Sequence, residues 1–253
     1  MGITLNALMN LLNHELKPEL FKDYCPNGLQ VEGKPSIKRI VTGVTACQQL
    51  IDEAIRLNAD ALLVHHGYFW RGENQAITGM KQRRIRSLLN HGISLITYHL
   101  PLDAHPTMGN NAQLAHLMGW ETQGGMEPDK KHSIGNWGTL PAPISLDILC
   151  IQLEKILNRK PLIIDGGEHP VHSLAWCTGA AQSMIQQALD LGVDAFISGE
   201  ISESTVHFAR ENNIHYISAG HHATERYGVQ ALGQWLEKET GITCPFVDIN
   251  SPV

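Results

Sequence analysis

Two adjacent histidines, His65 and His66, follow the apolar run at residues 61–64 and precede Gly67. Such a run is typical of a strand buried on both faces, and the glycine marks the point where the strand gives way to a loop. Ligands bind at the carboxyl ends of parallel strands, and neutral imidazole is the commonest transition-metal ligand near neutral pH. The pair therefore indicates a metal site at the end of this strand.

Two further stretches place a histidine four residues before a carboxylate. His99 precedes Asp103 in this way, and His221 precedes Glu225. If the second stretch begins a helix, its two side chains lie on one face about one turn apart, which allows both to bind one metal ion. In the first stretch Pro101 disfavours a helix, so Asp103 is expected to project from a loop.

The candidate ligands combine imidazole and carboxylate groups without thiolate, a set that suits Zn, Mn, Fe or Ni better than Ca or Mg. Three or four such groups suffice for one ion, whereas five or six indicate two ions that share a carboxylate. Each residue alone also fits a plain turn, a helix start or a solvated face. The set gains weight because its members fall where strands are expected to end. It comprises His65, His66, Asp103, His221 and Glu225, with His99 as a sixth candidate.

An internal repeat would bring these residues together. Residues 40–64 and 175–198 each predict a strand, a Thr-Gly turn, a helix and a second strand, and both helices carry the apolar spacing of a helix packed on a sheet. A further helix and strand extend each half, over residues 81–98 and 203–219. We therefore expect an α/β fold of two interlinked β-α-β lobes, with mostly parallel sheets forming an internal pseudo-repeat and the metal site in the cleft between the lobes.

The stretch at residues 119–170 separates the two halves and is rich in glycine and proline turns. We place the domain boundary there, which gives a first α/β lobe at residues 1–125 and a second at residues 126–253. The second lobe returns ligands to the shared site through residues 220–226.

Composition excludes several other classes of protein. The net charge of −6 argues against extended binding to nucleic acid or to an anionic membrane surface. No apolar stretch approaches the length of a membrane span. The five cysteines are scattered and never form a Cys-x-x-Cys pair, which predicts reduced thiols in a cytoplasmic protein.

Four polar residues are candidates for roles beside metal binding. His99 and His222 are candidates for proton transfer, and Asn27 for substrate orientation. Glu200 occupies the place in the second half that His66 occupies in the first. It is a candidate catalytic residue that supports the ligands or carries a proton, and the alternative is a helix-start carboxylate that the helix dipole favours. Because two carboxylates offset only part of the charge of two divalent ions, the pocket favours a phosphate or hydroxide ligand.

Five motifs resemble the family of GTP cyclohydrolase 1 type 2 homologs, also called the Nif-three-like family. They cover nearly the whole chain, whose length is similar to that of the short bacterial form without a central extra domain. The motifs are DYCPNGLQVEG at 23–33, VHHG at 64–67, HLPLD at 99–103, GNN at 109–111 and GHHATE at 220–225.

The resemblance implies a dinuclear site in which His66 and Asp103 hold one ion, His65 and His221 hold the other, and Glu225 bridges both. It also implies a toroidal homohexamer, a trimer of dimers, with the sites facing an inner cavity. For function the resemblance implies less, because the family's name comes from GTP ring opening by a relative and other members are known as interaction partners or metal-handling proteins. We expect a metal-dependent hydrolase that acts on a nucleotide such as GTP or on a similar phosphorylated small molecule. The alternative is a non-enzymatic metal-binding scaffold, metal-delivery protein or interaction protein.

Overall fold

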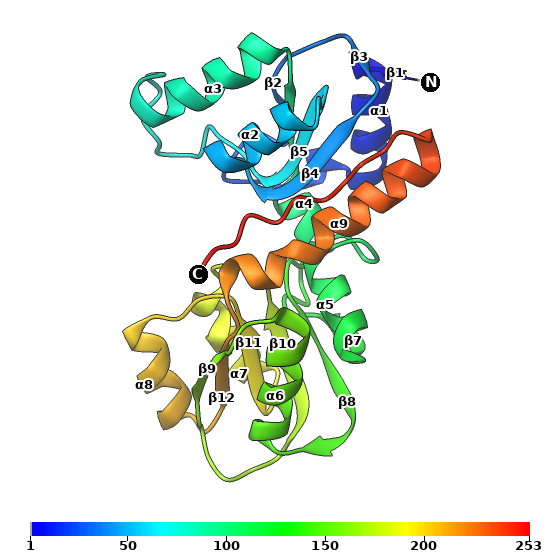
Figure 1. Ribbon diagram of the computed structural model, residues 1–253. Helices are drawn as coiled ribbons and strands as arrows, with labels where there is room; N and C mark the ends of the chain where they lie inside the picture. The colour runs from blue at the N-terminus through cyan, green and yellow to red at the C-terminus, as the bar shows by residue number, and fades with distance from the viewer. Residues whose placement is uncertain (1) are drawn as a thin grey trace. The chain divides into compact units, whose positions relative to one another are not determined.

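The computed structural model describes residues 2–253, which form two compact units (Figure 1). The first unit comprises residues up to 108 together with Gly228–Ile249, and the second comprises Gly109–Tyr227 together with Asn250–Val253. The last helix, α9 (His221–Thr240), begins in the second unit and continues in the first.

The first unit is built on a four-stranded sheet with the strand order β2-β6-β5-β4. The strands β4, β5 and β6 are parallel, and β2 pairs antiparallel with β6 at one edge. A separate antiparallel pair joins β1 to β3. The strands are β1 (Ile3–Thr4), β2 (Gly28–Val31), β3 (Ser36–Ile37), β4 (Ile40–Thr45), β5 (Ala61–His66) and β6 (Ser94–Thr97).

Helices cover both faces of this sheet because alternate strand residues are apolar on both sides. Ile40 and Val44 of β4 pack against α1 and the later part of α9, whereas Val41 packs against α2 and α3. Figure 1 shows these two pairs of helices on opposite sides of the sheet. The helices are α1 (Leu5–Leu16), the 3-10 helix η1 (Pro18–Leu20), α2 (Gln48–Arg56), α3 (Gly79–His91) and α4 (Leu100–Asp103).

The second unit is built on a six-stranded sheet with the order β7-β8-β10-β11-β12-β9. Its central strands β10, β11 and β12 are parallel, and all other pairings are antiparallel. The strands are β7 (Glu121–Gly125), β8 (Asn136–Ile144), β9 (Leu162–Ile164), β10 (Val171–Cys177), β11 (Ala195–Ser198) and β12 (His215–Ser218).

This sheet also has an apolar layer on each face. Leu174 and Trp176 pack with α5 and α6, whereas Phe196 and Tyr216 pack with α7 and α8. Ser145 caps the start of α6, since its hydroxyl accepts the N–H of Ile148 at 3.3 Å. The helices are α5 (Asn110–Met118), α6 (Leu146–Leu157), the 3-10 helix η2 (Gln182–Met184), α7 (Ile185–Asp190) and α8 (Glu203–Glu211).

The α/β class and the internal repeat are confirmed. The order β4-α2-β5-α3-β6 of the first unit recurs as β10-α7-β11-α8-β12 in the second. In each unit the three repeated strands are parallel, as the sequence predicts. Both sheets are nevertheless mixed, because antiparallel strands from outside the repeat are added at their edges.

The two units divide the chain at positions that differ from the expected boundary at residue 125. Residues 109–125 belong to the second unit, where Leu114 and Trp120 join its core and β7 pairs with β8. The turn-rich stretch that suggested the boundary therefore lies inside that unit. Residues 228–249 belong to the first unit, because Leu232 and Leu236 of α9 are buried in its core.

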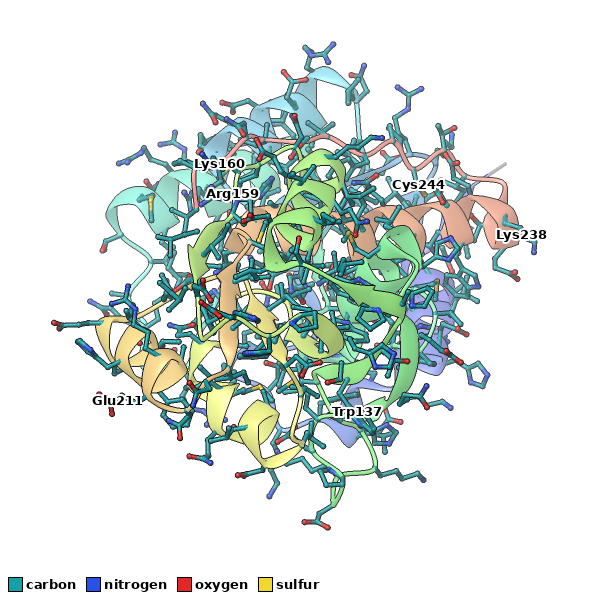
Figure 2. All side chains as sticks on the ribbon, turned by 90° about the horizontal axis from the view of Figure 1, so that it is seen from below. Trp137, Arg159, Lys160, Glu211, Lys238 and Cys244 are labelled. Atoms are coloured by element: carbon teal, nitrogen blue, oxygen red, sulfur yellow. The ribbon has the colours of Figure 1, made fainter. Side chains whose placement is uncertain are left out.

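Charged side chains cover the outside of both units. Figure 2 shows Glu211 at the end of α8 and Lys238 near the end of α9, both exposed and pointing away from the ribbon. Within residues 2–253, none of the helices combines the length and the apolar character that crossing a bilayer requires.

Candidate metal site

The strand β5 delivers His65 into the interior of the first unit. The His65 ring is fully buried, and its Nδ1 lies 3.0 Å from the carbonyl oxygen of Tyr98. Because a carbonyl only accepts hydrogen bonds, Nδ1 carries a proton, which leaves Nε2 as the nitrogen that could bind a metal ion. That Nε2 lies 3.5 Å from Oδ1 of Asp103, which is also buried.

His66 is the last residue of β5 and is half-buried. Its Nδ1 lies 3.2 Å from the hydroxyl of Thr45 on the neighbouring strand β4. The centroids of the His65 and His66 rings are 4.5 Å apart, so the end of the strand turns both rings to one side. One ligand atom each of His65, His66 and His99 lies within 4.8 Å of the others. The structure therefore brings the adjacent histidines and His99 together, as the strand-end argument predicts.

An aspartate that the sequence argument passed over holds His99 in place. Oδ1 of Asp23 lies 2.7 Å from Nδ1 of His99, and Oδ2 accepts the N–H of Leu100 at 2.9 Å. Burial alone would raise the pKa of Asp23, but the hydrogen bond and the charge of His99 outweigh it and hold that pKa below its usual value. The only sequence signal for Asp23 is its place at the start of the motif at residues 23–33.

Both the nitrogen and the oxygen of the Asn27 side-chain amide, the candidate for substrate orientation, form hydrogen bonds with protein groups. Its Nδ2 donates to Oδ2 of Asp23 at 2.8 Å, and its Oδ1 accepts the N–H of His99 at 2.8 Å. These contacts position His99 and Asp23. The structure therefore places Asn27 behind the cluster as a support for its geometry.

Asp103 lies at the end of one helical turn, α4, and the expectation of a loop there is wrong. Pro101 occupies the second position of this turn. The first residues of a helix have no intrahelical acceptor for their N–H groups, so a proline is tolerated there. The penalty for proline applies to the interior of a helix, which α4 is too short to have.

In the second unit, α9 begins at His221 and carries Glu225 one turn later. Nε2 of His221 lies 3.1 Å from Oε2 of Glu225, which confirms the predicted i, i+4 geometry. Glu225 is almost completely buried, at 2% exposure. A carboxylate buried to this extent requires a positive partner.

Glu200, which follows β11 as His66 ends β5, contacts the other nitrogen of the same ring. Its Oε1 lies 2.7 Å from Nδ1 of His221. Burial lowers the pKa of His221, but the carboxylates of Glu225 and Glu200 outweigh burial and raise it to about 9. The ring is therefore protonated at neutral pH unless a cation replaces the proton. His222, the other proton-transfer candidate on this helix, is half-buried and donates its backbone N–H to the carbonyl of Val253 at 3.0 Å.

A glycine after β10 makes room for Glu225. A Cβ atom at Gly179 would lie 2.1 Å from Oε1 of Glu225 and 3.3 Å from Nε2 of His221, and φ of this residue is +70°. Both the lack of space and the left-handed backbone disfavour a side chain at this position. The N–H of Gly179 donates to the hydroxyl of Thr224 at 3.1 Å, which fixes the turn against the start of α9.

The donor groups fit a transition-metal site. Each of four histidines has a hydrogen-bonding neighbour at Nδ1, which leaves Nε2 to bind a metal ion or, in His99, to take up a proton. This is the usual arrangement of metal-binding histidines, whose second nitrogen is oriented by a carbonyl, a hydroxyl or a carboxylate. The pairs are His65 with Tyr98, His66 with Thr45, His99 with Asp23 and His221 with Glu200.

Comparisons with known sequences agree along the whole chain. The family model described as Duf34/NIF3 (NGG1p interacting factor 3) matches residues 3–252. A Pseudomonas aeruginosa protein named GTP cyclohydrolase 1 type 2 homolog is 52% identical over 252 residues, which cover 100% of both chains. A Vibrio cholerae protein of the same name is 55% identical over 245 residues, covering 96% of this chain and 97% of its own.

Solved structures resemble the fold over nearly all residues. The protein ybgI, described as of unknown function, superposes with a TM-score of 0.95 at 50% identity, covering 99% of this chain and 100% of its own. TTHA1606 from Thermus thermophilus has a TM-score of 0.90 at 30% identity, with the same coverage. Reduced HcgD from Methanocaldococcus jannaschii has a TM-score of 0.86 at 20% identity, covering 98% and 99%, and supports the fold alone.

Proposed function

This chain belongs to the Duf34/NIF3 (NGG1p interacting factor 3) family, and we propose that it is a metal-dependent hydrolase that acts on a nucleotide such as GTP. The observation that carries the proposal is the way each histidine of the candidate site is held through Nδ1. An orienting neighbour at the second ring nitrogen is the usual arrangement of metal-binding histidines. The name of the curated relatives, GTP cyclohydrolase 1 type 2 homolog, supports a nucleotide as substrate.

We propose that the chain binds two divalent ions, drawn from Zn, Mn, Fe and Ni. His66 and Asp103 would bind one ion, His65 and His221 the other, and Glu225 would bridge them. The two oxygens of the buried Glu225 suit the bridging role.

Two bound ions would lower the pKa of a shared water molecule and polarise the bond that is attacked. The protein would supply proton transfer through His99. Asp23 holds the proton on Nδ1 of His99, so Nε2 is the atom that would take up a proton from the nucleophile. Glu200 would act on the reaction only through the orientation of His221.

Elemental analysis and turnover of GTP test this proposal together. We expect two transition-metal ions per chain in the purified protein, and loss of both metal and turnover in His66→Ala and in Glu225→Ala. Because the two variants lie in different units, loss of both ions in each would support a shared site. The control is His14→Ala, since His14 is exposed on α1.

Two results would contradict the proposal in different ways. Wild-type turnover by metal-free Glu225→Ala would show that the cluster has no part in the reaction. Stoichiometric metal without turnover of any nucleotide in a broad panel would favour the non-enzymatic alternative, a metal-binding or metal-delivery protein.

A further inference from the structure

Three side chains of the first unit form an aromatic and cationic patch beside the histidine cluster, and we call it the Tyr24 patch. It consists of Tyr24, Trp70 and Arg71. The ring centroid of Trp70 lies 5.0 Å from that of His99, at 85°, and 5.9 Å from that of His66. The ring centroid of Tyr24 lies 6.4 Å from that of His99, at 63°. The patch therefore borders two members of the cluster.

The Tyr24 side chain is exposed although its position is firmly held. Tyr24 is 57% exposed, an unusual state for a large aromatic residue next to a buried polar cluster. Its carbonyl accepts the N–H of Arg71 at 2.7 Å, and Nη2 of Arg71 donates to the carbonyl of Asp23 at 2.9 Å. The N–H of Tyr24 donates to Oδ1 of Asp23 at 2.6 Å. The ring thus stands on a fixed backbone with most of its surface open to solvent.

The guanidinium of Arg71 adds a positive charge to the patch. Its Cζ lies 5.7 Å from the centroid of the Tyr24 ring, within the range of a cation–π contact. The contacts of Tyr24 and Trp70 with His99 are edge contacts. Arg71 therefore lies over one face of the Tyr24 ring, and the 57% exposure of the side chain leaves much of its remaining surface open to solvent.

The loop that carries Trp70 contains a residue with a strained backbone. Phe69 has φ of +65°, a left-handed conformation that is unfavourable for a bulky residue. The loop is fixed nevertheless, because Nε1 of Trp70 donates to the carbonyl of Gly67 at 3.1 Å and Lys81 lies 4.8 Å from the centroid of the Phe69 ring. Strained residues that the surroundings enforce are found preferentially at binding sites.

We propose that the Tyr24 patch binds the planar base of a nucleotide by stacking and holds it beside His66 and His99. Every nucleobase has a π face that stacks on an aromatic side chain, and an arginine adds to the attraction. The base would lie on Tyr24, with Trp70 bordering it and Arg71 close to its polar edge. This inference rests on the proposed function and names the residues that select a nucleotide over a simple phosphate.

Calorimetric titration with two probes tests the patch without requiring turnover. The probes are guanosine 5′-monophosphate and ribose 5-phosphate, which lacks the base. We expect the wild type to bind the nucleotide more tightly than the sugar phosphate. Tyr24→Leu should weaken nucleotide binding about tenfold, since one stacked base contributes on the order of this factor. Tyr24→Phe keeps the ring and should stay within about twofold of the wild type, and binding of ribose 5-phosphate should be the same in all three proteins.

Trp70→Leu extends the test to the second ring, with the same expected direction. Thermal unfolding of each variant verifies that the fold is intact, and the exposure of Tyr24 favours this for Tyr24→Leu. Equal nucleotide affinity in the wild type and Tyr24→Leu would overturn the inference. Affinity for the nucleotide no greater than for ribose 5-phosphate, or no binding of it at all, would do the same.

Failure of the inference and failure of the proposed function are distinguishable. Tyr24-dependent binding of the nucleotide without turnover would uphold the stacking patch and contradict the hydrolase. Turnover of GTP with nucleotide affinity that does not depend on Tyr24 would do the reverse. Tighter Tyr24-dependent binding of a ten-residue oligothymidylate than of the mononucleotide would overturn the inference in favour of a single strand as the ligand.

Discussion

The hydrogen bond at one ring nitrogen decides what the other nitrogen of a histidine can do. Sequence spacing predicted the two histidines at the end of β5 and the pair on α9, because strand ends and helical turns have regular geometry. It did not predict what orients them. Tyr98 contributes a backbone carbonyl and Thr45 an ordinary hydroxyl, and neither has a recognisable spacing from the histidine it contacts. Such partners become evident only when the chain is folded.

Removal of one such partner should weaken metal binding without abolishing it. Glu200→Gln removes the negative charge at Nδ1 of His221 but keeps a hydrogen-bonding group. We expect the affinity for the metal to fall about 10- to 100-fold, the usual cost of losing an orienting carboxylate. Competition with a chelator of known affinity measures the change. Glu203→Gln, an exposed carboxylate in the first turn of α8, is the matched control. Unchanged affinity in Glu200→Gln would contradict the role assigned to Glu200.

Substitutions at two glycines distinguish the effect of backbone strain from that of steric contact with Glu225. Gly179→Ala would place a Cβ atom 2.1 Å from Oε1 of Glu225, whereas Gly192→Ala, at a similar φ of +69°, meets nothing within 4 Å. Each variant should lose about 1 kcal/mol of unfolding free energy, from the left-handed backbone. Only Gly179→Ala should lose bound metal as well. Chemical denaturation and elemental analysis measure the two effects, and retention of metal by Gly179→Ala would contradict the placement of Glu225.

At the scale of elements, an aspartate in each half of the repeat accepts backbone N–H groups at the start of the first parallel strand. Oδ2 of Asp60, before β5, accepts the N–H groups of Lys38 and Arg39. Oδ2 of Asp194, before β11, accepts those of His172 and Ser173. Apolar periodicity predicted the strands and helices that these aspartates join. It did not reveal the antiparallel strands β2, β7, β8 and β9, because these strands lie outside the repeat and lack the continuous apolar runs of its parallel strands.

The hydrogen bonds to the Asp194 carboxylate should make the unfolding free energy of the second unit fall at low pH. Burial would raise the pKa of Asp194, but the N–H groups of Ser173 and His172 outweigh burial and lower it. Its stabilisation is therefore complete above the unfolded value, about 3.9, and is lost as the pH falls through the lower folded value. Asp194→Asn should cost about 1 kcal/mol at pH 7, the low end for a charged hydrogen bond because the carboxylate is partly exposed.

Urea denaturation at pH 7 and at pH 3 measures this difference. The gap between the wild type and Asp194→Asn should narrow at the lower pH. Glu211→Gln, at an exposed carboxylate, should behave as the wild type at both. A difference in unfolding free energy that is larger at pH 3 than at pH 7 would contradict the stabilising role of the Asp194 carboxylate.

For the whole molecule, the homohexamer stays a prediction. Light scattering should give a mass six times the 28.0 kDa of the chain. Neighbouring exposed aliphatic side chains support association, since contiguous apolar patches often mark contact surfaces, and Ile148 lies one turn before Ile151 on α6 with 47% exposure. Ile151 on α6 is 65% exposed. We expect Ile151→Asp to reduce the mass, whereas Gln152→Asp, at the adjacent exposed position, should leave it unchanged. A monomeric mass for the wild type would contradict the prediction.

The path of the chain sets the order in which the protein can be completed during synthesis. The core of the first unit needs Leu232 and Leu236 of α9, and bridges join β4 to Phe246 and its preceding residue Arg39 to Thr243. A nascent chain therefore reaches residue 227 with its middle portion fully synthesised while its opening portion still lacks several inner side chains. The first unit can therefore complete its core only after most of the second unit has been synthesised, and chaperones that shield apolar surface would stay in contact with its sheet during that time.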